Sequence, residues 1–233
     1  MPMQPTYNKL LELPLFQGMS ISDLEQVIMS THFGFMNTAG GRTVIKDGDS
    51  CNRLLFLIKG TLCTESIPDD RRYIIEEEIY APNILQPECL FGLTQRYTKT
   101  FRAITDCEFM SINKQEAMKI SDNFDIFRLN LLNILCTQTQ KATRHPWRIH
   151  PQGIRAKIAR FMETRCTKPA GKKTLYIKME QLGREINESR LNISRELNAM
   201  NDEGIITLRR SEICFPLLER LILTAGAEQQ DNL

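Results

Sequence analysis

The chain has 233 residues, 42% of them hydrophobic, and a formal net charge of +2. A chain of this length can bury one large core or two smaller ones, and we expect two domains of unequal size. No stretch approaches the roughly 20 consecutive apolar residues of a membrane-spanning helix, and the first residues lack the basic-then-apolar order of a signal peptide. These features argue against a membrane partner and predict a cytoplasmic protein.

The seven cysteines, at positions 51, 63, 89, 107, 136, 166 and 214, are odd in number and never form a Cys-x-x-Cys pair. This scatter argues against a disulfide framework and against a zinc site, so no metal is expected. We expect reduced thiols that fill core positions.

Charge is shared unevenly, because residues 148–233 carry +4 and residues 1–147 carry −2. A basic C-terminal part suits a polyanionic partner, since neutralised phosphates release condensed counterions. An ordinary solvated surface can have the same balance, so charge alone does not identify the partner.

The N-terminal half begins with a short helix and continues as strands. Residues 20–30 place Ile21, Leu24, Val27 and Ile28 at helical spacing behind a polar cap. From about residue 34, short β-rich runs separated by turn residues predict a sandwich or barrel. These runs cover residues 42–46, 53–60, 71–80 and 107–112.

A helical pattern resumes at 114–120, and a longer one extends from about residue 122 to 144 with two apolar stripes. One stripe consists of Phe124, Phe127, Leu131, Ile134 and Leu135, and the other of Ile126, Leu129, Leu132 and Cys136. Such a helix needs two covering surfaces. We expect the barrel on one side and the same helix of a second subunit on the other, in a C2 seam. A helix buried within one chain is the alternative.

The domain boundary is expected near two His-Pro pairs, at 145–146 and 150–151, because a residue before proline is pushed out of helical geometry. This gives a sensor domain at 1–147 and a second domain at 148–233. In the second domain, residues 153–165 predict an amphipathic helix and residues 174–178 a short strand.

Residues 179–206 predict two helices joined by a tight turn, which is a helix-turn-helix. Gly183 lets the second helix cross closely, Asn187 tolerates a left-handed backbone in the turn, and Ser189 caps the second helix. That helix is expected to end at Gly204. The apolar residues expected on its inward face are Leu191, Ile193, Leu197 and Met200.

The second helix then presents polar side chains that suit base edges, namely Arg190, Asn192, Ser194 and Arg195. Arginine can pair bidentately with guanine, and asparagine with adenine. The β-like runs on either side of Ser211 predict a wing whose Arg209 and Arg210 suit phosphates.

The order of these parts resembles the CRP/FNR family of bacterial regulators over roughly residues 10 to 220. Residues 46–62 (KDGDSCNRLLFLIKGTL) resemble its glycine-turn and Lys-Gly signature, and residues 177–206 match its helix-turn-helix without a gap. The resemblance implies an α+β fold with a jelly-roll (double-stranded β-helix) barrel, a long dimerisation helix and a winged helix-turn-helix. It also implies a homodimer that binds double-stranded palindromic DNA, with an unidentified small effector and RNA polymerase as further partners.

In this resemblance Arg190 and Arg195 fall on base-reading positions, and Ser189 and Asn192 on backbone-contacting positions. Two residues depart from the family pattern. Leu191 stands where the family usually has Glu, which implies a different half-site, and Glu196 replaces an apolar core residue.

The effector segment, PECLFGLTQRYTKTFRA at 87–103, fits the family less closely. Glu88 and Thr98 fall on the ribose- and phosphate-binding positions, but Pro87 replaces a glycine and Tyr97 replaces the phosphate-pairing arginine. Arg96 is one position away, which along a strand means the opposite face, unless the shorter loop shifts the register. Cyclic AMP is therefore not the expected effector. On the long helix, Gln138, Thr139 and Gln140 are expected to contact an effector.

Other sensing chemistry is not favoured. No cysteine precedes Cys51, which argues against the N-terminal iron-sulfur cluster of some family members, and His32 is expected in a surface or cap role rather than as a haem ligand. An enzyme is not expected, because no histidine lies between residues 33 and 144 and no catalytic motif occurs. A small-molecule-binding signalling module with a vestigial DNA-binding domain remains the alternative.

Overall fold

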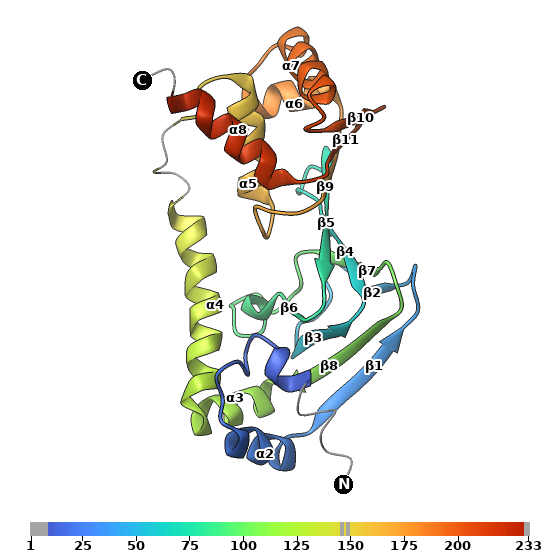
Figure 1. The fold of residues 1–233 in the computed structure, drawn as a ribbon. Helices are drawn as coiled ribbons and strands as arrows, with labels where there is room; N and C mark the ends of the chain where they lie inside the picture. The colour runs from blue at the N-terminus through green and yellow to red at the C-terminus, as the bar shows by residue number, and fades with distance from the viewer. Residues whose placement is uncertain (1–8, 145–146, 148–149, 231–233) are drawn as a thin grey trace. The chain divides into compact units, whose positions relative to one another are not determined.

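The computed structural model describes residues 9–144, 147 and 150–230, the last five by backbone alone. The chain divides into two compact units (Figure 1). The first contains the described residues up to Cys63 and from Ile79 to Arg144. The second contains Thr64–Glu78 and the described residues from Trp147 onward. Residues 64–78 thus cluster with the C-terminal part, although a boundary near residue 147 places them in the sensor domain.

The first unit is built on antiparallel strands, as the expected barrel requires. One sheet has the strand order β1-β8-β3-β6, and β4, β7 and β2 are neighbours in the other. The runs expected at 42–46, 53–60 and 107–112 are confirmed as β2, β3 and β8, whereas β1, β4, β6 and β7 were not expected. The bounds are α2 Ile21–Ser30, β1 Phe33–Thr38, β2 Thr43–Ile45, β3 Arg53–Lys59, β4 Thr61–Ser66, β6 Asn83–Leu85, η1 Pro87–Cys89, β7 Thr100–Ala103 and β8 Cys107–Asn113.

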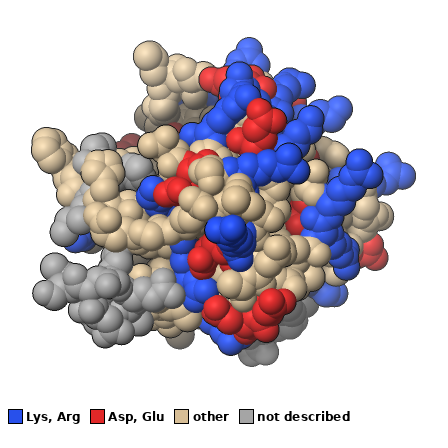
Figure 2. All heavy atoms as spheres, turned by 90° about the horizontal axis from the view of Figure 1, so that it is seen from above, with Lys and Arg blue, Asp and Glu red and all other residues tan. Residues whose placement is uncertain are grey.

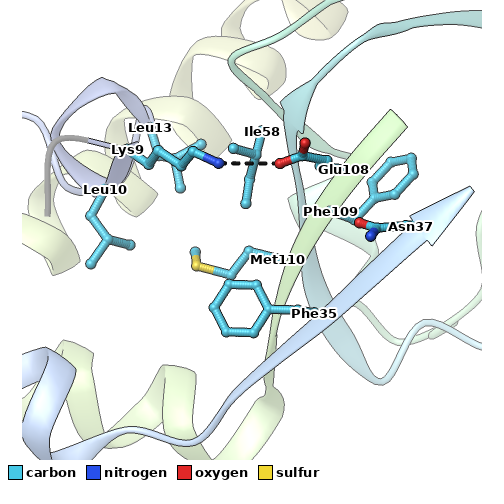
Figure 3. A pocket seen from close by; sticks show the side chains of 9 residues that line it. All are labelled: Lys9, Leu10, Leu13, Phe35, Asn37, Ile58, Glu108, Phe109 and Met110. Carbon is cyan, nitrogen blue, oxygen red and sulfur yellow. Dashed lines mark hydrogen bonds and ion pairs between the residues drawn. The ribbon is translucent and has the colours of Figure 1, made fainter. Parts of the chain in front are cut away.

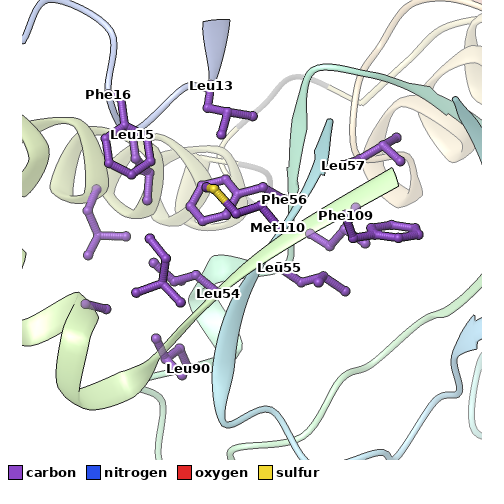
Figure 4. Packing of buried hydrophobic residues seen from close by; sticks show 14 of the residues in the cluster. Leu13, Leu15, Phe16, Leu54, Leu55, Phe56, Leu57, Leu90, Phe109 and Met110 are labelled. Carbon is purple, nitrogen blue, oxygen red and sulfur yellow. The ribbon is translucent and has the colours of Figure 1, made fainter. Parts of the chain in front are cut away.

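The core of this unit includes one sheet face and the helices that cover it. Phe56 on β3 is fully buried, and its ring lies 5.9 Å from that of Phe16. Phe16, which is labelled with Phe56 in Figure 4, in turn lies 5.2 Å from Phe127 of the long helix. Aromatic rings at such separations add to the free energy gained from burying their area.

The long helix α4 runs from Asp125 to Arg144. It begins later than the expected residue 122, because the preceding helix α3 (Lys114–Asn123) continues beyond its expected end at residue 120. Phe124, which follows α3, has an extended backbone. Phe127 and Leu131 of α4 are buried, and Phe124, Ile134 and Leu135 pack partly against the same core. The first predicted apolar stripe therefore covers the barrel, as expected. Among the described residues, no helix combines the length and apolarity needed to cross a membrane.

The second unit combines helices with a sheet whose strand order is β10-β11-β9-β5. The expected helix at 153–165, strand at 174–178 and wing strands are confirmed within one or two residues, whereas α8 was not expected. The bounds are β5 Tyr73–Tyr80, α5 Ile154–Arg165, β9 Lys173–Ile177, α6 Met179–Ile186, α7 Arg190–Asp202, β10 Thr207–Arg209, β11 Glu212–Phe215 and α8 Leu218–Gln230.

Strand β5 pairs with β9 along five residues, from Tyr73 opposite Ile177 to Glu77 opposite Lys173. The last pair is a buried ion pair, with side chains 2% and 3% exposed and a separation of 3.2 Å. The Glu77 carboxylate also accepts hydrogen bonds from the Thr167 backbone N–H at 2.9 Å and from its hydroxyl at 3.0 Å. These bonds offset much of the cost of burying the carboxylate.

This buried pair makes a testable prediction about stability. Glu77→Leu leaves Lys173 buried without its charged partner, so the free energy of unfolding should fall by about 3–5 kcal/mol. The double variant Glu77→Leu/Lys173→Met removes the uncompensated charge but not the loss of the Thr167 hydrogen bonds, so it should recover only part of this free energy in urea titrations followed by circular dichroism. Lys172→Met, which breaks a more exposed pair with Glu78, should cost less than about 1 kcal/mol. Equal losses in both single variants would contradict the prediction.

Candidate nucleic-acid interface and effector site

The helix-turn-helix is formed by α6, a short turn and α7. Asn187 ends α6 with φ 54° and ψ 57°, in the left-handed conformation expected for it. Ser189 caps α7, and its hydroxyl accepts a hydrogen bond from the Asn192 backbone N–H at 3.2 Å. A Cβ on Gly183 would lie 2.7 Å from the Glu188 carbonyl oxygen. The close approach at Gly183 is therefore to the turn itself, with Ile193 of α7 next nearest.

Three side chains hold α7 against its unit: Ile193, Leu197 and Met200 are fully buried. Leu191 is different, since 59% of the residue is exposed. The prediction that Leu191 lies on the inward face is wrong. At about 100° per residue, the inward face of α7 is centred near Ile193 and Leu197, and Leu191 points almost directly away from it.

Arg155 of α5 binds two acidic side chains, one within α7 and one at its end. Its guanidinium donates to Glu196 at 2.8 Å and makes a two-pronged contact with Glu203 at 2.9 and 2.7 Å. This explains the acidic residue at 196, because its partner is the largely buried Arg155. The same guanidinium holds the pKa of Glu203 below its usual value through hydrogen bonding and charge. Lys157 adds a 2.6 Å contact to Glu188 in the turn.

The side chains expected to read bases lie on the free surface of α7. Arg190, Asn192 and Arg195 are exposed, and Ser194 is half-buried. In the wing, β10 and β11 are joined by a turn in which Ser211 has φ 58°. Arg209 and Arg210 are exposed there, and Arg209 lies 3.8 Å from Glu212. Figure 2, seen from the side on which α7 lies, shows Lys and Arg side chains gathered with some acidic groups between them.

The expected effector segment has its polar groups already paired. Gln86 has a left-handed backbone at the start of η1. Its side-chain amide donates to the Thr98 hydroxyl at 2.7 Å and accepts from the Thr98 backbone N–H at 3.1 Å. It also lies 3.5 Å from Glu88. The groups of Thr98 that the resemblance assigns to phosphate are therefore engaged by Gln86, which sequence reasoning did not single out.

Tyr97 is a core residue rather than a ligand contact. It is 5% exposed, and its hydroxyl is hydrogen-bonded to the thiol of Cys51. Burial raises the pKa of Tyr97 and of Cys51. Burial and the nearby Glu88 raise the pKa of Cys89 to about 11. These thiols stay protonated near neutral pH, as unreactive core groups do.

Two of the remaining expected effector residues, Arg96 and Thr139, bond to backbone carbonyl oxygens. Arg96 donates to the Gly48 carbonyl oxygen at 2.7 Å. On α4, Thr139 is exposed and donates to the Leu135 carbonyl oxygen, and Gln138 is half-buried. In the described part of the chain, no hydrogen bond joins Gln138 or Thr139 to Glu88 or Thr98.

A separate cavity of about 140 Å³ lies on the face of the β1-β8-β3 sheet, beneath helical residues 9–12. Leu10, Leu13, Phe35, Ile58 and Met110 make its apolar wall, and Lys9 meets Glu108 across it at 3.1 Å (Figure 3). The cavity is smaller than the roughly 300 Å³ at which pockets for drug-sized ligands begin. It contains none of the expected effector residues.

Across residues 9–144, 147 and 150–230, no group of three His, Cys, Asp or Glu side chains is placed to hold a metal ion. His32 lies close to Glu116. The pKa of Glu116 is lowered chiefly by Lys119 and further by His32.

One family model matches the β-rich part of the first unit. The family model for the cyclic nucleotide-binding domain matches residues 36–123. This part of the chain is therefore similar to a cyclic nucleotide-binding domain. The sensor domain of the transcriptional regulator DNR from Pseudomonas aeruginosa has the same fold, with a TM-score of 0.50 and 18% identity over 65% of this chain and 97% of that one.

Relatives of this domain architecture are transcriptional regulators. The cAMP-activated global transcriptional regulator Vfr of Pseudomonas aeruginosa is 24% identical over 176 residues, which is 72% of this chain and 82% of Vfr. The catabolite activator protein of Thermus thermophilus covers 91% of this chain and 99% of its own, with 16% identity and a TM-score of 0.47. The predicted resemblance to CRP/FNR regulators and the predicted fold class are confirmed.

Although residues 36–123 match that family model, the polar groups at the expected phosphate position do not suit a cyclic phosphate. A bound phosphate needs charge-assisted donors to offset its burial. Here Tyr97 stands where the resemblance expects the arginine, Arg96 bonds to Gly48, and Gln86 binds both the backbone N–H and the hydroxyl oxygen of Thr98.

Cyclic AMP should therefore leave the melting temperature unchanged at millimolar concentration, whereas a ligand at 100 times its Kd stabilises by about 2.7 kcal/mol. Differential scanning fluorimetry measures the shift. Gln86→Ala, which releases Thr98, should also stay unresponsive, because Tyr97 stands at the position expected for the phosphate-pairing arginine and Arg96 bonds to Gly48. A saturable rise for the wild type would contradict this assignment, and a rise in the variant alone would identify Gln86 as the sole obstacle.

Proposed function

We propose that this chain is a cytoplasmic DNA-binding transcription regulator that acts as a homodimer and not as an enzyme. The observation that carries the proposal is the two-faced character of α7. Ile193, Leu197 and Met200 are fully buried, whereas Arg190 and Arg195 are exposed. A helix held on one side and free on the other suits insertion into a major groove.

The free residues offer both kinds of contact that DNA recognition requires. Arg190, Asn192, Ser194 and Arg195 are assigned to base edges and nearby backbone, with Ser189 at the helix start. Arg209 and Arg210 of the wing are assigned to phosphates, which position the protein without reading sequence. The relatives named above are regulators, which supports this reading.

The second stripe of α4 supports dimerisation. Ile126, Leu129 and Leu132 are 39%, 59% and 49% exposed, and Cys136 is exposed on the same stripe. Apolar residues repeated every three or four positions suit a helix–helix seam. A C2 dimer of this kind binds two half-sites about one helical turn apart, so the operator should be palindromic.

Regulation is proposed to come from a small effector that prefers one of two arrangements of the dimer. The residues assigned to it are Glu88, Arg96, Thr98, Gln138 and Thr139. Gln86 must release Thr98, or contribute to recognition itself, for such a ligand to bind. RNA polymerase is the proposed protein partner at promoters.

The DNA assignments are tested by selecting sites from a random double-stranded DNA library with the full-length protein. Arg190→Ala should relax one base position and cost roughly 1–3 kcal/mol in binding free energy. Arg210→Ala should weaken all sequences alike and reduce the salt slope by about 1. Selection of no sequence by the wild type, or equal loss of discrimination in both variants, would overturn these roles.

The seam is tested by oligomeric state. Leu129→Glu/Leu132→Glu places charge in an apolar contact, so a dimer should become a monomer with unchanged helix content. Sedimentation velocity measures the mass, and circular dichroism the helix content. Lys141→Glu introduces the same charge outside the stripe and should remain dimeric. A wild-type monomer would refute the seam, as would a double variant that stays dimeric.

A further inference from the structure

Leu191 occupies the centre of the free surface of α7. With about 100° between successive residues, Leu191 and Arg195 both point within about 30° of the direction opposite the buried face. Arg190 precedes Leu191 in the chain, and Ser194 follows one turn later. The leucine is 59% exposed, and it stands among polar side chains.

Exposure alone does not give this residue a role, because single apolar residues are common on protein surfaces. Its place does, since it lies in the first turn of α7, between two arginines that are free to contact bases. A side chain in this position of a recognition helix meets a base edge. Leucine can neither donate nor accept a hydrogen bond.

The major groove presents one apolar group on a base edge, the C5-methyl of thymine. Against cytosine or adenine, a leucine would cover an amino group and leave its hydrogen bond unmade, which costs binding free energy. Against thymine, it buries a methyl group and removes apolar area from water.

We propose that Leu191 is a specificity-determining residue that selects thymine at one position of each half-site through contact with the C5-methyl group. This inference rests on the proposed function. It adds thymine to the bases that the polar residues of α7 are proposed to read. The occupant of the exposed surface is thus the major groove of double-stranded DNA, in keeping with the positive side chains on either side of the leucine.

The experiment compares wild type, Leu191→Ala and Leu191→Glu in selections from the same random DNA library. The wild type should select a palindrome with a thymine that Leu191→Ala no longer requires. Leu191→Glu should favour cytosine there, because a carboxylate accepts from the cytosine amino group. Leu223→Ala, which truncates another exposed leucine of the same unit, should keep the wild-type preference.

Base analogues then isolate the methyl group within the selected site. Replacing that thymine with deoxyuridine should weaken wild-type binding about three- to tenfold, and should leave Leu191→Ala binding unchanged. 5-Methylcytosine should bind the wild type more tightly than cytosine at the same position. Circular dichroism and binding to non-specific DNA verify that each variant is folded.

The outcomes separate two failures. A wild type that selects no sequence refutes the proposed function. A wild type that selects a site while Leu191→Ala keeps the same thymine preference, with the same response to deoxyuridine, refutes the role of Leu191 and leaves the regulator intact.

Discussion

The burial of Ile193, Leu197 and Met200 fixes the rotation of α7, and every exposed residue of that helix depends on it. A rotation by one position would bring Glu196 or Asn198 inward in place of Leu197. Arg155 opposes such a rotation, because it binds Glu196 within the helix and Glu203 at its end. Apolar packing therefore sets which side chains face outward, and the shared guanidinium holds that setting.

In the first unit, polar groups at the expected effector site bond to one another. Residues 36–123 match the cyclic nucleotide-binding family model, yet Thr98 is bonded to Gln86 and Tyr97 to Cys51. Groups at the expected effector position therefore have partners within the chain. A ligand must compete with these bonds, each worth about 1 kcal/mol net.

Local chemistry predicted much of this structure. The left-handed Asn187, the Ser189 cap and the barrel-facing stripe of α4 follow from residue type and spacing. The exposure of Leu191 did not follow, because an analysis of apolar periodicity assigns each leucine to the inward face. The partner of Glu196 was also hidden, since Arg155 lies 41 residues away in the chain. The anomaly at Glu196 was nevertheless the signal that a basic partner exists. The left-handed backbone of Gln86 has no comparable sequence signal.

Strand β5 has a consequence for how the chain can be divided. The C-terminal unit borrows residues 64–78 from the middle of the sequence, and Glu77 from that segment neutralises Lys173. A fragment that starts near residue 148 would expose the edge of β9 and leave a buried ammonium without its counterion. Open strand edges invite pairing between molecules. A fragment of this unit would therefore need residues 64–78 joined to it.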